Sequence, residues 1–200
     1  MEEAIGFGSK GLALEGLIDK KPGDKGVIVT HPHPLYGGDM YNAVVEWIIN
    51  VYRSHNYTTL RFNFRGVGKS QGSHDNGIGE QEDVLCAISI LKDKGLKSID
   101  LAGYSFGSWV NASVANNAEM IDRLIMVSPP VGFINFDSIE KLVSLALVVT
   151  GSVDDIAPVD SIKEKMLLWN KSARLEVIEG ADHFYSGYGE ALALILSSIL

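Results

Sequence analysis

The sequence predicts an α/β fold in which helices cover both faces of one doubly wound, mostly parallel β-sheet. Short apolar runs rich in β-branched residues alternate with longer segments whose apolar residues recur at helical spacing. Loops rich in glycine and proline, such as HPHPLYGGD at 31–39, separate the two kinds of segment. A repeated strand–loop–helix order is typical of parallel sheets, because parallel neighbours need a crossover connection between them.

The N-terminal segment departs from this order. Residues 3–20 contain two short runs, AIGFGS and LALEGLI, on either side of a lysine–glycine turn. Two such runs joined by a short turn indicate a β-hairpin. We therefore expect an antiparallel hairpin at the edge of the sheet.

The other strands are short runs of apolar and β-branched residues, and the helices between them are longer and amphipathic. Strands are expected at 26–30, 57–64, 98–104, 122–128, 145–151 and 174–180. Helices are expected at 40–55, 79–95, 106–117, 158–170 and 188–200. The helix at 79–95 has acids in its first turn and ends at a glycine, as the helix dipole and the helix stop signals favour. The chain contains no repeat and no linker, so we expect one domain over 1–200.

Composition narrows the class of protein. Hydrophobic residues make up 46% and charged residues 21%, which is a globular composition. Cys86 is the only cysteine, which excludes an intrachain disulfide. The formal charge of −8 disfavours a nucleic-acid partner.

The start MEEAIGFG lacks a signal-peptide pattern, and no apolar run approaches the length of a membrane span, so we expect a cytoplasmic protein. We expect the protein to be a monomer or a homodimer.

The stretch GVGKSQG at 66–72 suggests a phosphate-binding loop, but the spacing excludes it. That loop needs G-x-x-x-x-G-K-[ST], and the residue five before Gly68 is Asn63 rather than glycine. The segment after Ser70, QGSHDNGIG, is not helical, so no helix N-terminus follows to hold a phosphate. We interpret Gly66–Gly72 as a structural glycine turn.

Two segments match the nucleophile pattern G-x-S-x-G, one around Ser70 and one around Ser105. A nucleophile elbow needs a strand, a sharp turn and then a helix. Ser105 has the strand SIDLAGY before it and the helical segment SWVNASVANN after it, whereas Ser70 has only the strand. The sequence therefore favours Ser105 as the nucleophile.

A serine nucleophile needs a histidine base that is held by a carboxylate, and in elbow folds these partners follow the serine in the order acid, then histidine. His183 is the only histidine after Ser105, and it directly follows a predicted strand. Asp154 and Asp155 both follow the strand at 145–151, and we prefer Asp154 as the acid. Asp182 is disfavoured because adjacent side chains usually point apart.

The oxyanion of an acyl-transfer intermediate needs N–H donors. The backbone N–H of Phe106 is one candidate. The other should come from the loop at 31–39, where prolines have no N–H, so His33 or Leu35 must supply it. Tyr36, Phe133 and Phe136, with Phe106, are expected to line an apolar substrate cleft.

The histidines of HPHP also raise the possibility of a metal site with nearby aspartates and His74. The sequence has no HxxxH spacing and no cysteine ligand set, so we expect neither a metal nor a cofactor. His31 is expected to pack under the loop, hydrogen-bonded to the backbone.

Taken together, these segments resemble the α/β-hydrolase superfamily, and most closely its small bacterial members near the dienelactone hydrolase and serine aminopeptidase-like branches. The segments that carry the resemblance are HPHPLYGGDM, RFNFRGVGKSQG, GYSFG, GSVDDIAP and ADHFY. The resemblance implies that Arg65 is structural. Family members often have HG where this chain has His31-Pro32, which leaves the second oxyanion donor open. Dienelactone hydrolases use a cysteine nucleophile, so their lactone substrate does not carry over to a chain with Ser105.

The resemblance implies a serine hydrolase acting on a small-molecule acyl substrate, an ester, thioester or lactone, through an acyl-enzyme. Lid domains in this superfamily commonly follow the strand at 122–128, and here only about sixteen residues precede the next strand. We therefore expect no cap domain. A peptidase or haloperoxidase-like activity on the same residues, or a non-catalytic binding module, are the alternatives.

Overall fold

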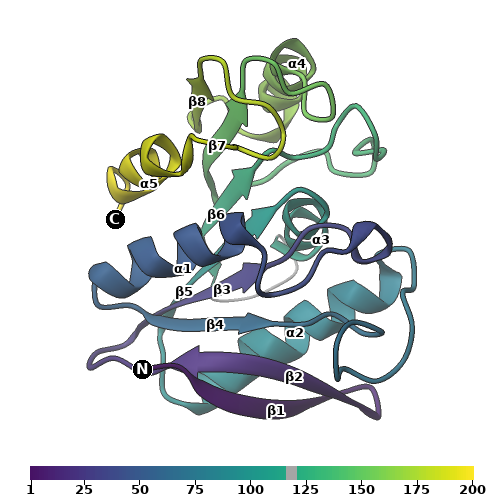
Figure 1. Cartoon of the computed structure of the whole chain (residues 1–200), viewed down its shortest axis with the longest axis vertical. Helices are drawn as coiled ribbons and strands as arrows, with labels where there is room; N and C mark the ends of the chain where they lie inside the picture. The colour runs from purple at the N-terminus through teal and green to yellow at the C-terminus, as the bar shows by residue number, and fades with distance from the viewer. Residues whose placement is uncertain (116–120) are drawn as a thin grey trace.

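The computed structural model describes residues 1–115 and 121–200. Within them, eight strands form one sheet in the order β1-β2-β4-β3-β5-β6-β7-β8 (Figure 1). The strands are β1 Glu3–Ser9, β2 Leu12–Asp19, β3 Lys25–Thr30, β4 Thr58–Phe62, β5 Ser98–Tyr104, β6 Ile121–Val127, β7 Leu145–Gly151 and β8 Arg174–Ile178. β1 pairs antiparallel with β2, β2 pairs antiparallel with β4, and all other neighbours are parallel. The mostly parallel sheet and its antiparallel edge hairpin are confirmed.

Five helices of the described residues cover the two faces of the sheet: α1 Ala43–Ser54, α2 Ile78–Asp93, α3 Phe106–Ala115, α4 Val159–Trp169 and α5 Gly189–Ser197. α1 and α5 pack together over one face, where their apolar residues share a core cluster with Val27, Val29 and Val149. α2, α3 and α4 contribute to a second cluster on the other face. Because the central strands are buried on both faces, they read as continuous apolar runs in the sequence.

The boundaries differ from the sequence expectations by a few residues. β4 ends at Phe62 rather than at residue 64. The backbone N–H of Asn63 still donates to Glu15 O of β2, but that of Phe64 donates to the ring of His31 instead of to a strand. α1 begins after Asn42, whose side chain caps it. Residues 116–117, the expected end of the helix at 106–117, lie outside the described residues.

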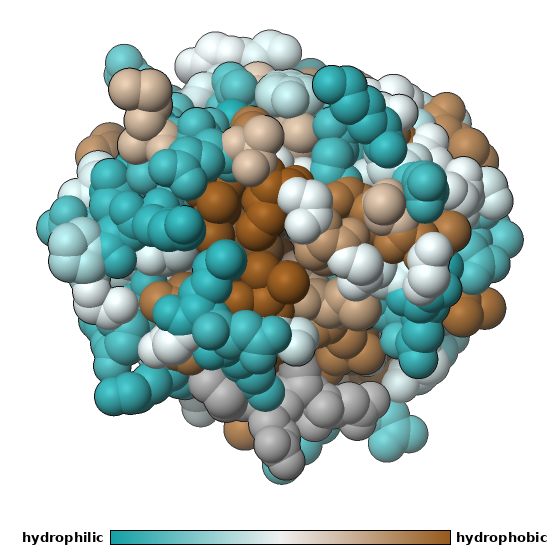
Figure 2. Space-filling model, turned by 90° about the horizontal axis from the view of Figure 1, so that it is seen from below, coloured by the Kyte–Doolittle hydropathy of each residue, from teal (hydrophilic) through white to brown (hydrophobic). Residues whose placement is uncertain are grey.

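The hairpin edge of the molecule is covered from one side by α2. Ile5 and Leu12 of the hairpin are partly buried against the core cluster beneath α2. Seen from below the view of Figure 1, onto the hairpin edge, hydrophobic residues gather near the centre of the face, with hydrophilic residues to the left and right of them (Figure 2). Across residues 1–115 and 121–200, no helix has both the length and the hydropathy that a membrane crossing requires.

Candidate active site

Ser105 lies at the junction of β5 and α3, and its backbone has φ of 53°. This left-handed conformation is unfavourable for a residue with a Cβ atom, and it turns the chain sharply from strand to helix. The flanking glycines allow the turn to pack closely. A Cβ atom on Gly103 would lie 2.6 Å from Ser108 N, and one on Gly107 would lie 2.7 Å from His31 O. Larger residues at either position would push α3 away from the sheet.

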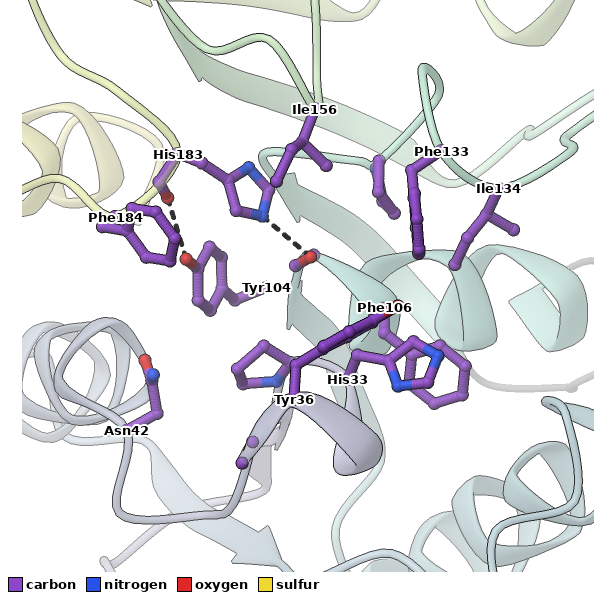
Figure 3. Close-up of a pocket in the computed structure, with 15 residues that line it drawn as sticks. His33, Tyr36, Asn42, Tyr104, Phe106, Phe133, Ile134, Ile156, His183 and Phe184 are labelled. Carbon is purple, nitrogen blue, oxygen red and sulfur yellow. Dashed lines mark hydrogen bonds between the residues drawn. The ribbon is translucent and has the colours of Figure 1, made fainter.

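The structure brings Ser105, His183 and Asp154 into one hydrogen-bonded row at the carboxyl ends of three strands. His183 Nε2 lies 2.9 Å from Ser105 Oγ (Figure 3). His183 Nδ1 lies 3.0 Å from Asp154 Oδ1 and 2.9 Å from Oδ2. All three side chains belong to buried residues. Asp155 is exposed instead, and Asp182 accepts a hydrogen bond from Phe184 N.

The carboxylate of Asp154 is surrounded by donors. Oδ1 accepts hydrogen bonds from the backbone N–H groups of Ile156 at 3.0 Å and Ala157 at 2.8 Å, and Oδ2 accepts one from Ser128 Oγ at 2.7 Å. Burial alone would raise the pKa of Asp154, but the hydrogen bonds from His183, Ser128 and Ala157 outweigh it and lower that pKa. Asp154 is therefore held as an anion beside the imidazole.

Two residues that line the cavity beside Ser105, Phe106 and His33, have backbone N–H groups without an acceptor among the described residues. Phe106 is the first residue of α3, and N–H groups in a first helical turn have no acceptor within the helix. Among the described residues, the backbone N–H of His33 has no acceptor either. The N–H of Leu35 donates to His33 Nδ1 at 3.2 Å, so this group is already occupied. Of the two expected residues, His33 therefore has the N–H group without a partner, and Leu35 does not.

A cavity of about 480 Å³ opens in front of Ser105 and His183. Its walls come from the loop after β3, the elbow, the β6–β7 and β7–α4 connections and the segment after β8. The lining residues that matter below are Asn42, Tyr104, Phe106, Phe133, Ile134 and Phe184. No described residue that lines it is a lysine, arginine, aspartate or glutamate.

The aromatic residues expected at the cleft divide into two groups. Tyr36 and Phe133 line the cavity, with 74% and 59% of their surface exposed, and their ring centroids lie 5.9 Å apart. The expectation for Phe136 is wrong. Its ring is only 1% exposed and packs against Trp169 of α4, so it belongs to the core. The β6–β7 connection contains no helix, and no cap domain covers the cavity.

His31, Ser70 and Arg65 have structural contacts. His31 is buried, its Nδ1 lies 2.7 Å from Pro32 O, and its Nε2 accepts from Phe64 N–H, so burial lowers its pKa to about 4. Ser70 Oγ donates to Asn63 O and accepts from Glu15 N–H. Arg65 forms two hydrogen bonds with the buried carboxylate of Asp83. Within the described residues, no three histidine, cysteine or acidic side chains are placed to hold a metal ion.

Comparison with known proteins places this arrangement in a family. The model of the alpha/beta hydrolase family matches residues 83–192, more than half of the chain. The chain belongs to the alpha/beta hydrolase family. It is 35% identical over 168 residues to the uncharacterized protein RP471 of Rickettsia prowazekii, covering 79% of this chain and 71% of that protein.

Two solved structures resemble this alpha/beta hydrolase over nearly its whole length. An alpha-beta serine hydrolase homologue from Coxiella burnetii is 35% identical, with a TM-score of 0.92, covering 99% of this chain and 97% of that one. XC6422 from Xanthomonas campestris, described as an a/b serine hydrolase without lid, is 28% identical, with a TM-score of 0.90, covering 98% of this chain and 92% of that one. The resemblance deduced from the sequence motifs is confirmed.

Several residues at the site of this alpha/beta hydrolase escaped the sequence analysis. Ser128 and Tyr185 are buried, with φ of 46° and 55°, and their hydroxyl oxygens lie 2.7 Å apart. Tyr104 donates a hydrogen bond to His183 O at 2.8 Å. The place of Ser128, directly after a parallel strand, was a usable signal, because polar groups at these strand ends meet at one edge of the sheet.

Proposed function

We propose that this chain hydrolyses small, uncharged carboxylic esters or thioesters, with Ser105 as nucleophile, His183 as general base and Asp154 as the carboxylate that orients the imidazole. Membership of the family already supports a hydrolase. The observation that carries the finer proposal is the 2.9 Å contact between Ser105 Oγ and His183 Nε2 at the wall of an uncharged cavity.

In the first half of the reaction, Ser105 Oγ attacks the acyl carbon while its proton passes to His183 Nε2. The Asp154 carboxylate accepts from His183 Nδ1–H, which selects the tautomer with a free Nε2 lone pair and then stabilises the imidazolium. The backbone N–H groups of Phe106 and His33 are the proposed donors to the oxyanion. His183 returns the proton to the leaving oxygen or sulfur, and the bond between that atom and the acyl carbon breaks.

In the second half, water attacks the acyl-serine, with His183 taking the proton of the water and returning it to Ser105 Oγ. The products are a carboxylic acid and an alcohol or thiol. The lining of the cavity supports an uncharged acyl group, since a carboxylate or phosphate on the substrate would meet no lysine or arginine among the lining residues.

A fluorophosphonate probe tests the proposal, because it reacts only with an activated serine. We expect stoichiometric labelling at Ser105, and complete loss of both labelling and ester hydrolysis in Ser105→Ala. Ser70→Ala is the matched control from the second G-x-S-x-G segment, and it should keep labelling. Absence of labelling in the folded wild-type protein would instead favour a non-catalytic binding module.

A further inference from the structure

The cavity extends to two sides of Ser105, and the two sides differ in chemistry. Tyr104, Phe184 and Asn42 lie on the side of the cavity from which the His183 side chain enters, whereas Phe106, Phe133 and Ile134 lie on the other side (Figure 3). We call the first group the histidine-side arm and the second the apolar arm. The three residues of the apolar arm offer hydrocarbon and ring surfaces, and Tyr36 and His33 line the cavity on the same side. The histidine-side arm ends at a side-chain amide.

The proposed mechanism fixes which part of an ester enters which arm. His183 Nε2 must reach the leaving oxygen to protonate it, so the alcohol portion has to extend into the histidine-side arm. The oxyanion is directed at the N–H of Phe106, the first residue of α3, and the remaining substituent of the tetrahedral carbon is the acyl chain. That chain is left with the apolar arm, where Phe133 is 59% exposed and available for contact.

One of the two polar groups of the Asn42 side chain is available to bind a substrate. Its Oδ1 accepts a hydrogen bond from Val44 N–H at 2.9 Å and so caps α1. This cap orients the side-chain amide, because only the oxygen can accept from a backbone N–H. No described residue accepts a hydrogen bond from Asn42 Nδ2. The amide projects from the start of α1 toward Tyr104 and Phe184 (Figure 3).

The hydroxyl of Tyr104 does not compete for this role. It already donates its proton to His183 O at 2.8 Å. Phe184, which is 66% exposed, stands edge-on to the ring of His183 with centroids 5.8 Å apart and supplies apolar surface beside the amide. An alcohol portion in this arm therefore meets a ring first and a hydrogen-bond donor at its end.

We infer that Asn42 Nδ2 is a specificity-determining donor, and that the substrates are esters whose alcohol portion carries a hydrogen-bond acceptor, such as an ether, hydroxyl or carbonyl oxygen, beyond the ester oxygen. The acyl portion is apolar and packs against Phe133 and Ile134. This inference rests on the proposed function, because it uses the proton transfer from His183 to decide which arm receives the leaving group.

The test compares two esters of equal length, butyl butyrate and 2-methoxyethyl butyrate, which differ at one position by a methylene or an ether oxygen. The readout is the ratio of their kcat/KM values. Asn42→Asp keeps the cap acceptor and the reach of the side chain but removes the donor. We expect kcat/KM for the methoxyethyl ester, divided by kcat/KM for the butyl ester, to fall about tenfold in this variant, because one hydrogen bond to the substrate is lost. Asn42→Ser, which also keeps a cap acceptor, should lower the ratio in the same direction.

Asn135→Asp is the control for the charge change. Asn135 is exposed outside the cavity, and its Oδ1 likewise accepts from a backbone N–H two residues on, that of Asp137. This variant should leave the ratio unchanged. Phe133→Ala tests the other arm: it should reduce the preference for butyrate over acetate esters of one alcohol, with no change in the ratio between the two alcohols.

The outcomes separate this inference from the proposed function. Ester turnover with an unchanged alcohol ratio in Asn42→Asp overturns the role of Asn42 and leaves the Ser105 mechanism in place. A change in the alcohol ratio in Phe133→Ala, without one in Asn42→Asp, overturns the assignment of the arms. A folded wild-type protein that turns over no ester and is not labelled at Ser105 removes both proposals.

Discussion

Ser105 adopts a backbone conformation that its own side chain disfavours. With φ of 53°, it lies in a region that destabilises an L-residue by about 1 kcal/mol or more. Surrounding hydrogen bonds hold it there: Ser105 N donates to Val127 O at 2.9 Å, and Ser105 O accepts from both the backbone N–H and the hydroxyl of Ser108. Strain of this kind is commonly found where geometry serves function.

Substitution at position 105 measures this strain directly. Ser105→Gly should be more stable than Ser105→Ala by about 1 kcal/mol, because glycine adopts positive φ without a Cβ penalty. Both variants lack the hydroxyl, so the comparison isolates the backbone term. Urea unfolding at neutral pH measures it. If the alanine variant were equally stable or more stable, the strand–helix junction would not be strained.

Ser128 acts on the site through Asp154. Because an ionised carboxylate only accepts, Ser128 Oγ must donate to Asp154 Oδ2, and the hydroxyl of Tyr185 must then donate to Ser128. Ser128→Ala keeps a Cβ atom at φ of 46° and removes one donor to the anion. We expect it to lower the free energy of unfolding by about 1.5 kcal/mol near neutral pH.

The pH dependence of that loss identifies its origin. Asp154 has a pKa below its ordinary value of 3.8 in the folded protein, so its contribution to stability is present above that value and disappears as pH falls through the folded pKa. Ser128→Ala moves the folded pKa up toward 3.8. The stability difference from wild type should therefore shrink as pH falls below about 4. Tyr185→Phe leaves the Ser128 donor in place, and its stability difference should vary much less with pH over the same range.

The sequence reveals those site residues that are marked by the pattern of their neighbours along the chain. It does not reveal residues whose role depends on contacts between distant segments. Ser105 stands out because strand, glycines and helix adjoin it, and His183 because chain order leaves a single choice. Ser128 follows β6 and Tyr185 lies in the connection between β8 and α5, so their contact joins positions 57 residues apart. Phe133 and Phe136 are three residues apart in a loop, and a loop has no periodicity from which to tell the exposed ring from the buried one.

At the scale of elements, the turn after β4 is joined to α2 by an ion pair. Arg65 Nη2 lies 2.7 Å from Asp83 Oδ1, and the Asp83 side chain has no exposed surface. The Asp83 carboxylate also accepts hydrogen bonds from Ser9 Oγ and from the backbone N–H of Arg65, and the bond from Ser9 extends the contact to β1. One carboxylate thus holds the hairpin, the turn and the helix together beside the site.

Removing the arginine should be costly, because it leaves a buried charge without its partner. We expect Arg65→Ala to reduce the free energy of unfolding by about 3 kcal/mol. Lys163→Ala, which breaks an exposed pair with Asp160, is the comparison and should change stability by less than about 0.5 kcal/mol. Chemical denaturation of both variants decides the matter: equal effects would show that the Arg65 pair contributes no more than a surface contact.

The elements that could be placed from the sequence are those whose burial leaves a periodic or continuous apolar pattern. β3 and β7 each lie between two other strands and read as nearly unbroken apolar runs. The end of β4 could not be placed, since Asn63 and Phe64 look like strand residues. The N–H of Asn63 still donates to Glu15 O of β2, but the N–H of Phe64 donates to the ring of His31, a long-range contact that the sequence does not show.

At the scale of the whole molecule, the two ends of the sheet have different roles. The candidate site lies at the carboxyl ends of the strands. Near the opposite end, Arg123 of β6 pairs with Asp100 of β5 at 2.6 Å, donates to the hydroxyl of Tyr57 at 2.8 Å and donates to Ile199 O. This cluster ties the central strands to the segment before β4 and to the C-terminal residues. We expect this cluster to contribute to the free energy of unfolding and to have no effect on the reactivity of Ser105.

Arg123→Met should therefore lower the free energy of unfolding by about 3 kcal/mol, because Asp100, whose side chain is only 1% exposed, would be left as an unpaired buried acid. Adding Asp100→Asn removes that charge and keeps the size of the side chain, so the double variant should recover a large part of the loss. The rate of fluorophosphonate labelling at Ser105, per folded molecule, should be the same in all three proteins. A double variant no more stable than Arg123→Met would show that the lost packing and hydrogen bonds of the arginine, rather than the charge of Asp100, govern this end of the sheet.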